Sequence, residues 1–196
     1  MRLGEVIQSS SVNYVAQGYD IKSPPPLGLF VTAGQDVPNT IGIVQNVKVE
    51  PFDPSRPVLA RGKILETEEQ VFEESPQLMD LLTIRFDCLI LGYETERGIV
   101  EGLASVPPMI HSFVSVTDTS VQNQIARNAS FVRSLLNATS VDPDALLIAT
   151  MRQLAENLGE EEYSNLVSSV QRNLMRELAR DASRLMNILK YIGGNT

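Results

Sequence analysis

Few side chains of this sequence belong to the types that carry catalysis or bind metals. His111 is the only histidine and Cys88 the only cysteine among 196 residues. One histidine cannot build a two-histidine metal site or relay, and no Gly-x-Ser-x-Gly elbow accompanies it. We expect His111 to be structural or to face solvent. Cys88 stands in an apolar run, which is typical of a small buried side chain.

A phosphate-binding loop would indicate a nucleotide-driven enzyme. Gly62-Lys63 is the only Gly-Lys pair, but Pro57 stands where that loop needs its first glycine, and Ile64 stands where it needs Ser or Thr. An enzyme of another kind would have to use carboxylates such as Asp87 or Glu101 near strand ends. The sequence brings no two of these together, so it predicts a non-catalytic protein with no catalytic residue, cofactor or metal site.

An acidic cluster is one of two charged patterns that could bind a partner. Its members are Glu68, Glu69, Glu73 and Glu74. The cluster is interpreted either as a docking patch, with Glu69 and Glu73 as partner-binding candidates, or as a weak divalent-cation site. A solvated helix face is the third interpretation, since charge runs usually have that role. The alternating oxygen ligands of a calcium loop are missing.

Arginines at intervals of four residues form the second charged pattern. They are Arg172, Arg176, Arg180 and Arg184. On one helix this spacing places them in a slowly drifting row. The row could bind an acidic partner, such as the N-terminal half of another copy, or consist of ordinary surface arginines partly neutralised by Glu177 and Asp181.

Charge is unevenly divided between the two halves of the chain. Residues 1–116 carry 8 basic and 15 acidic side chains (net −7), whereas residues 117–196 carry 8 and 9 (net −1). An acidic surface repels phosphate backbones. Trp is absent and aromatic residues make up only 6%, which leaves few platforms for stacking bases. We therefore expect no nucleic-acid partner as the first hypothesis, and retain binding through the arginine row as the alternative.

The sequence predicts a cytoplasmic protein with no membrane span. No apolar stretch approaches the roughly 20 residues that a spanning helix needs. The N-terminus reads as the start of a strand and lacks the long apolar region of a signal peptide.

Residues 1–116 have the pattern of a β-rich domain. Short apolar or alternating runs, broken by Pro and Gly, predict about six strands, near residues 1–7, 12–21, 27–32, 41–49, 84–90 and 99–103. Glycines inside and at the ends of these runs favour a small closed barrel over a flat sheet. One helical insertion is expected from Glu66 to Leu82, with a break at Ser75-Pro76.

Residues 117–196 have the pattern of about three α-helices. The first is capped by Asp118 or Ser120 and continues to Leu136. Asp142-Pro143-Asp144 opens the second helix with a capping carboxylate and a proline at the first helical position. The third starts at Glu160 and carries one apolar stripe over about seven turns, until Gly193-Gly194 stops it. The predicted fold class is thus α+β, a closed β-barrel over 1–116 followed by a helical bundle over 117–196.

Four segments of the N-terminal half resemble the HAS-barrel family. They are Leu3–Ile7, Gly18–Ile21, Pro26–Val31 and Ile41–Val47. The family supplies the small N-terminal barrel of HerA-type DNA translocases and of the catalytic-ring subunits of rotary ATP synthases. There a RecA-like ATPase domain follows the barrel; here about 80 helical residues follow, so the family's nucleotide-binding residues have no counterpart.

The resemblance implies the role that the barrel usually has in this family: it packs side by side into a ring collar or docks a partner protein. We therefore expect a non-catalytic assembly or adaptor protein, a homo-oligomer that self-associates or docks on a protein such as a ring-forming ATPase. Its barrel and its C-terminal helices would supply the interfaces.

Overall fold

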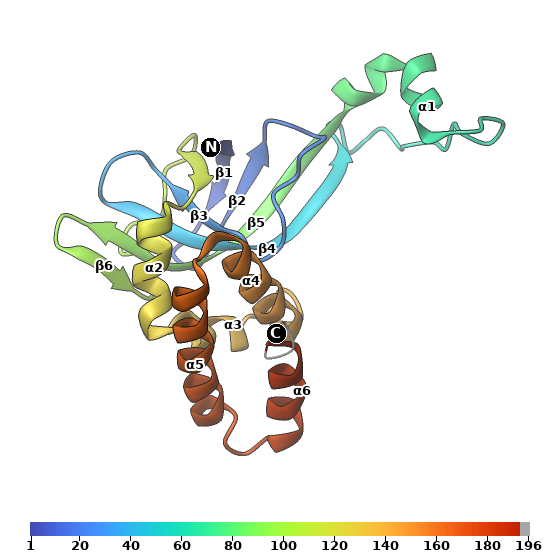
Figure 1. The fold of residues 1–196 in the computed structure, drawn as a ribbon. Coiled ribbons are helices and arrows are strands. Elements are labelled where there is room, and N and C mark those ends of the chain that lie inside the picture. Colours follow the sequence, from blue (N-terminus) through green and yellow to red (C-terminus); the bar gives the residue numbers. More distant parts are fainter. Residues whose placement is uncertain (193–196) are drawn as a thin grey trace.

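The structure, a computed structural model, describes residues 1–192. It combines a seven-stranded antiparallel sheet with α-helices, which confirms the α+β class (Figure 1). The predicted helix stop at Gly193-Gly194 lies outside the described residues. The strands are β1 (Arg2–Ser9), β2 (Asn13–Gly18), β3 (Phe30–Ala33), β4 (Asn39–Pro51), β5 (Leu82–Thr95), β6 (Gly98–Glu101) and β7 (Phe113–Val116).

Six of the strands pair in a continuous circuit. β1 pairs with β2 and β7, β7 with β3, β3 with β4, β4 with β5, and β5 again with β2. β6 is joined to the far end of β5 as a hairpin. The strand beyond the six predicted is β7, a run of four residues that is too short to show a clear alternation.

One irregularity of the sheet explains a break in the sequence pattern. The register of β4 against β5 shifts between Val44 and Asn46, so that Gln45 is an extra residue opposite the Cys88–Asp87 step. Such a bulge bends the strand and turns the extra side chain out of the alternation. Gln45 is buried there and interrupts the apolar face of β4.

The longest strands, β4 and β5, continue as an arm that projects from the body (Figure 1). The arm ends in α1 (Glu68–Glu74) and the 3₁₀ helix η1 (Pro76–Leu81), which confirms the predicted helical insertion. Gln70 Oε1 accepts hydrogen bonds from the backbone N–H of Glu66 and of Thr67, at 2.8 and 3.3 Å, and so closes the start of α1. The predicted break occurs at Pro76, which begins the second helix.

Residues 117–192, the described part of the C-terminal half, contain five α-helices, so the prediction of about three is wrong. They are α2 (Thr119–Asn128), α3 (Phe131–Leu136), α4 (Pro143–Asn157), α5 (Glu160–Glu177) and α6 (Ala182–Ile192). The first predicted helix divides because Ala129 has a left-handed backbone with φ of 48°. That conformation ends an α-helix, and it lets α3 turn toward the sheet.

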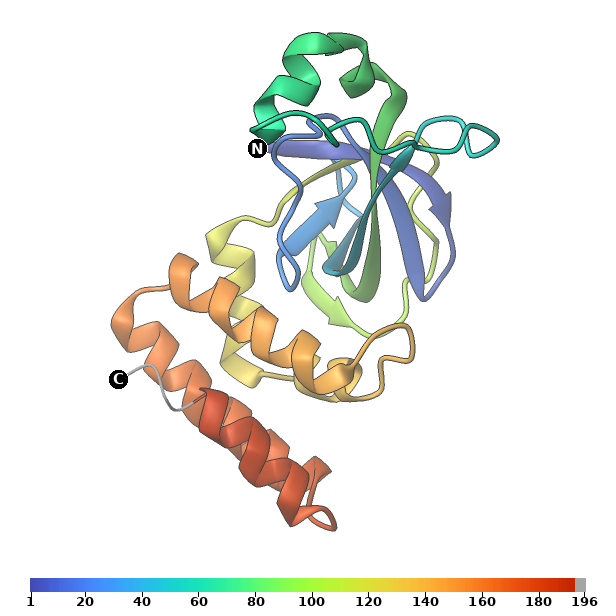
Figure 2. The same cartoon turned by 90° about the vertical axis from the view of Figure 1, so that its right-hand side faces the viewer.

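The last predicted helix also divides. α5 ends at Glu177, and the Asp181 carboxylate accepts a hydrogen bond from the Arg184 backbone N–H at 3.0 Å, which caps the start of α6. The two helices lie beside each other as a hairpin (Figure 2). The apolar stripe therefore folds back on itself and buries Leu174 and Ile188 in one core. The start of α4 is as predicted, since Asp142 Oδ1 accepts from the Asp144 backbone N–H at 3.0 Å.

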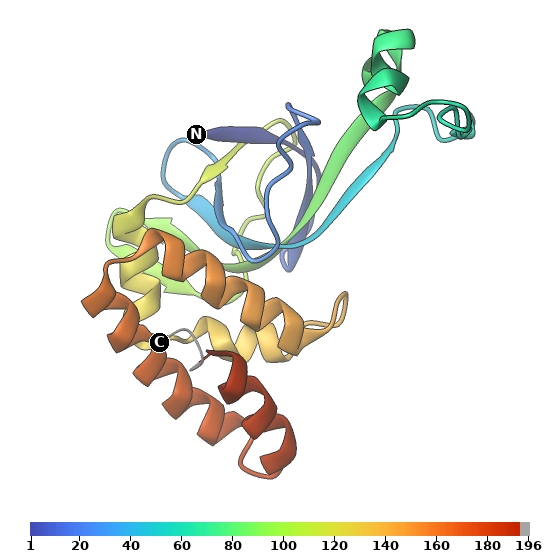
Figure 3. The same cartoon turned by 45° about the vertical axis from the view of Figure 1, so that its right-hand side comes forward.

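Two apolar cores lie on opposite sides of the sheet. One fills the interior of the strand circuit and includes Val31 of β3. The other joins the helices to the outer face of β3 and β4, where Phe30 alternates with Val31 and points the other way. The rings of Phe30 and Phe131 meet edge to face, with centroids 5.7 Å apart at an interplanar angle of 89°. Figure 3 shows the helices packed below the sheet.

Backbone contact reinforces this packing. Gly28 has a φ of +84°, and a Cβ there would lie 2.7 Å from the Thr150 Cα of α4. Only glycine permits both that conformation and that approach. The core on the helical side thus contains side chains from both parts of the chain, and the division at residues 116–117 stays a prediction.

Candidate functional site

The end of the arm has no core of its own. We call residues 52–81 the tip segment; it joins β4 to β5 and includes α1 and η1. No side chain in it is buried, although it contains many large apolar residues. Phe52, Leu59 and Ile64 are 63%, 70% and 88% exposed. A segment of this size that buries none of its apolar side chains presents them for contact with another surface.

Phe52 and Leu59, with other apolar side chains of the tip segment, line a groove. Its volume is about 830 Å³, and its walls come from the extended chain after β4, from α1 and from η1. The apolar walls include Phe52, Val58, Leu59, Phe72 and Leu81. A concave apolar surface of this kind suits the insertion of side chains from a partner helix.

The predicted acidic cluster lies on α1 beside the groove. Its four glutamates are exposed, and none forms an ion pair within residues 1–192. Glu69, Phe72 and Glu73 are spaced by three and four residues, which places them on one side of the helix. Val71 and Phe72 of α1 line the groove, whereas Glu69 and Glu73 are exposed on the same helix outside its lining. Both acidic partner-binding candidates therefore lie on a helix that forms one wall of the groove.

The arginine row is not continuous, which corrects the sequence interpretation. Arg172 and Arg176 belong to α5, Arg180 lies in the connection, and Arg184 belongs to α6. The break at Leu178–Asp181 ends the four-residue repeat because the chain reverses direction there.

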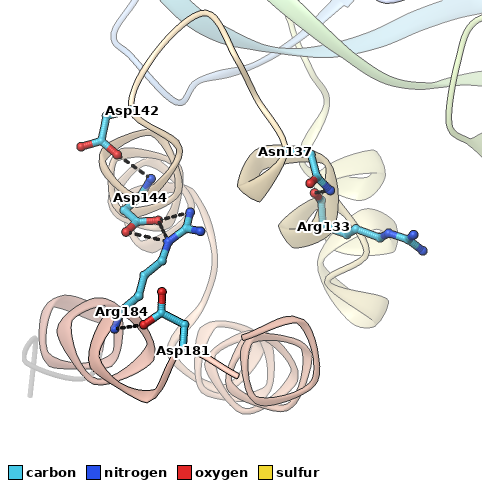
Figure 4. A network of polar contacts seen from close by, with 6 residues as sticks. All are labelled: Arg133, Asn137, Asp142, Asp144, Asp181 and Arg184. Atoms are coloured by element: carbon cyan, nitrogen blue, oxygen red, sulfur yellow. Dashed lines mark hydrogen bonds and ion pairs between the residues drawn. The ribbon is translucent and has the colours of Figure 1, made fainter. Parts of the chain in front are cut away.

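Arg184 has a structural role in the helical half (Figure 4). Its Nη2 and Nε donate to Asp144 Oδ1 at 2.7 and 2.8 Å, which links α6 to the first turn of α4. Hydrogen bonding to Asp144 raises the pKa of the Arg184 guanidinium above its ordinary value. Arg184 is therefore engaged within the chain, and at most three arginines of the row face outward.

Two of those three arginines, Arg172 and Arg176, form weak contacts within residues 1–192. Arg172 Nη2 donates to Ser169 Oγ at 2.9 Å, and Arg176 Nη2 donates to Asn173 Oδ1 at 2.8 Å. The ion pair of Arg176 with Glu177 is long, at 3.8 Å, and solvent-exposed. Such contacts contribute little free energy and exchange readily for a partner's carboxylates.

Cys88 and His111, the two side chains of types common in catalysis, differ in their exposure to solvent. Burial raises the pKa of the Cys88 thiol well above its ordinary value, which keeps it protonated and unreactive. His111 is exposed, as expected, and its Nδ1 lies 3.1 Å from Glu5 Oε2. Tyr19 Oη donates to the other oxygen of Glu5 at 2.7 Å. The hydrogen bond from Tyr19, and then that from His111, lower the pKa of Glu5 below its ordinary 4.5.

The carboxylates of the enzyme hypothesis are not brought together as an active site. Asp87 accepts a hydrogen bond from Asn46 Nδ2 at 3.0 Å and lies 3.7 Å from Lys48 Nζ. Glu101 lines a separate cavity between the β5–β6 hairpin and the helices. Within residues 1–192, no group of three or more His, Cys, Asp or Glu side chains is placed to hold a metal ion.

The tip groove is the feature that sequence reasoning missed. Its apolar residues follow no helical or strand period, and Pro54 and Pro57 interrupt them. The one signal was the coincidence of large apolar side chains with a proline-rich stretch beside an acidic helix.

No protein-family model and no curated relative matches this sequence. The resemblance to the HAS-barrel family stays a prediction from Leu3–Ile7, Gly18–Ile21, Pro26–Val31 and Ile41–Val47. None of the helices in the described part of the chain combines the length and the apolar character needed to cross a bilayer.

Proposed function

We propose that this chain is a non-catalytic assembly module that self-associates and can dock on a protein such as a ring-forming ATPase. The observation that carries the proposal is the tip segment, whose groove exposes apolar side chains while the two cores of the molecule are already filled. A large exposed apolar groove is typical of a surface that contacts another protein. The arginines of α5 offer a second surface, of opposite charge.

The strand circuit supports the barrel part of the proposal. Six strands that each pair with two neighbours are compatible with a small closed barrel of the HAS type. A closed barrel has no free edges, so its assembly would use side-chain surfaces and projections such as the arm. We place the module in the cytoplasm, where its single thiol stays reduced.

The mass of the purified protein in solution tests this function. Size-exclusion chromatography with light scattering, over a range of concentrations, is expected to give a mass above that of one chain. Affinity purification of the tagged protein from its native host is expected to recover a partner in stoichiometric amount. A mass of one chain at every concentration, with recovery of only the protein itself, would contradict the proposed function.

A further inference from the structure

We propose that the tip groove of one copy binds the C-terminal half of α5 of a second copy, in a head-to-tail contact. This inference rests on the proposed self-association and assigns the two surfaces that meet. The first surface is the groove together with Glu69 and Glu73, which are exposed on its α1 wall. The second, which we call the arginine face, consists of Arg172, Met175 and Arg176.

The two surfaces have the same spacing with opposite charge. On α1, two acids four residues apart flank an apolar side chain, in the order Glu69, Phe72, Glu73. On α5, two arginines four residues apart flank Met175, which is 55% exposed. When helices pack, side chains three and four residues apart form matching ridges. The two helices can therefore bring an apolar contact and two opposite charge pairs together.

The wider charge distribution favours the same partner. The tip segment carries 3 basic and 7 acidic residues (net −4), whereas residues 172–192 carry 5 and 2 (net +3). Like surfaces would repel each other, so a symmetric contact between two tip segments is disfavoured. A contact between unlike surfaces is attractive and is also steered electrostatically. A flexible, exposed methionine adapts readily to an apolar groove.

The position of the two surfaces requires a second copy. The arm and the α5–α6 hairpin lie at opposite ends of the molecule in Figures 1 and 2, so one chain cannot join them. In a head-to-tail contact each copy keeps one groove and one arginine face for further copies. Repetition of such a contact gives a ring if the rotation closes and a filament if it does not.

Charge reversal on each surface tests the contact. One variant carries Glu69→Arg and Glu73→Arg, which changes the net charge of its tip segment from −4 to 0 and places two positive side chains opposite the arginine face. The other carries Arg172→Glu and Arg176→Glu, so that both of its surfaces are negative. All four side chains are exposed, and far-UV circular dichroism checks that the fold is kept. A control variant with Arg152→Glu and Glu156→Arg reverses two exposed charges on α4, outside both surfaces.

We expect each reversed variant alone to associate about tenfold or more weakly than the wild type, because like charges meet at the contact. An equimolar mixture of the two variants should recover a high mass, since every head-to-tail contact then joins opposite charges. The control should keep the wild-type mass.

Three results would overturn the inference. If the wild type is an oligomer and both reversed variants keep its mass, the copies meet elsewhere and only this contact fails. The same holds if the mixture stays dissociated. If the wild type itself is a single chain at all concentrations, the proposed self-association fails together with the contact.

Discussion

At the scale of single residues, the best-defined polar cluster joins Glu5 to Tyr19 and His111. Hydrogen bonds to the carboxylate lower the native pKa of Glu5 below 4.5. The native state therefore favours the charged form more than the unfolded state does. The resulting stabilisation is fully present above the unfolded pKa and is lost as the pH falls through the native pKa.

This linkage predicts the behaviour of Glu5→Gln. The variant should be less stable than the wild type near neutral pH, and the difference should shrink as the pH falls from about 6 to about 3. Urea unfolding at a series of pH values measures it. Glu96→Gln, an exposed acid in the β5–β6 turn, should follow the wild-type profile. If the free energies of unfolding of the wild type and Glu5→Gln differ by the same amount at every pH, the pKa of Glu5 is not lowered in the native state.

At the scale of elements, the Arg184–Asp144 pair links α6 to α4. Arginine presents two parallel donors to the carboxylate, whereas lysine offers a point charge. Arg184→Lys should therefore lower the free energy of unfolding by about 1–2 kcal/mol. Denaturant unfolding measures the loss, and a cycle with Asp144→Asn isolates the coupling between the partners. Arg180→Lys is the matched control; an equal loss there would show that the geometry of the pair is unimportant.

Strand β5, helix α4 and the insertion between β4 and β5 are elements that the sequence predicts. The alternation of Ile84, Phe86 and Cys88 predicts β5, and the structure buries all three. Asp142-Pro143 predicts the start of α4 because the cap and the fixed φ of proline are local properties. The insertion between β4 and β5 is predicted from local signals in the same way, and so is the exposure of Glu69 and Glu73.

The helix breaks could not be predicted, since they depend on tertiary contacts. Alanine is the best helix former, yet Ala129 has a left-handed backbone where α3 turns to bring Phe131 onto Phe30. The apolar period continues through Leu178, so the sequence alone favours one long helix. The tip groove could not be predicted from the sequence either, because composition does not reveal whether an apolar run such as Val58-Leu59 is buried or exposed.

At the scale of the whole molecule, the packing couples the sheet to the helices. Phe30 of β3 and Phe131 of α3 belong to one core, and both are almost fully buried. The tip segment, by contrast, adds no buried side chain to either core. The free energy of unfolding should therefore depend on the sheet–helix boundary and hardly at all on the arm.

Replacement of two phenylalanines tests this division. Phe131→Ala removes a buried ring from the shared core and should lower the free energy of unfolding by about 3–5 kcal/mol. Hydrogen exchange read by mass spectrometry should then quicken in β3 and β4 as well as in α3 and α4, because all four contribute to that core. Phe72→Ala, at an exposed ring of the tip, should change stability by no more than about 0.5 kcal/mol. If exchange in Phe131→Ala quickens in the helices alone, the two parts of the chain unfold separately, and the division at residues 116–117 marks an independent domain.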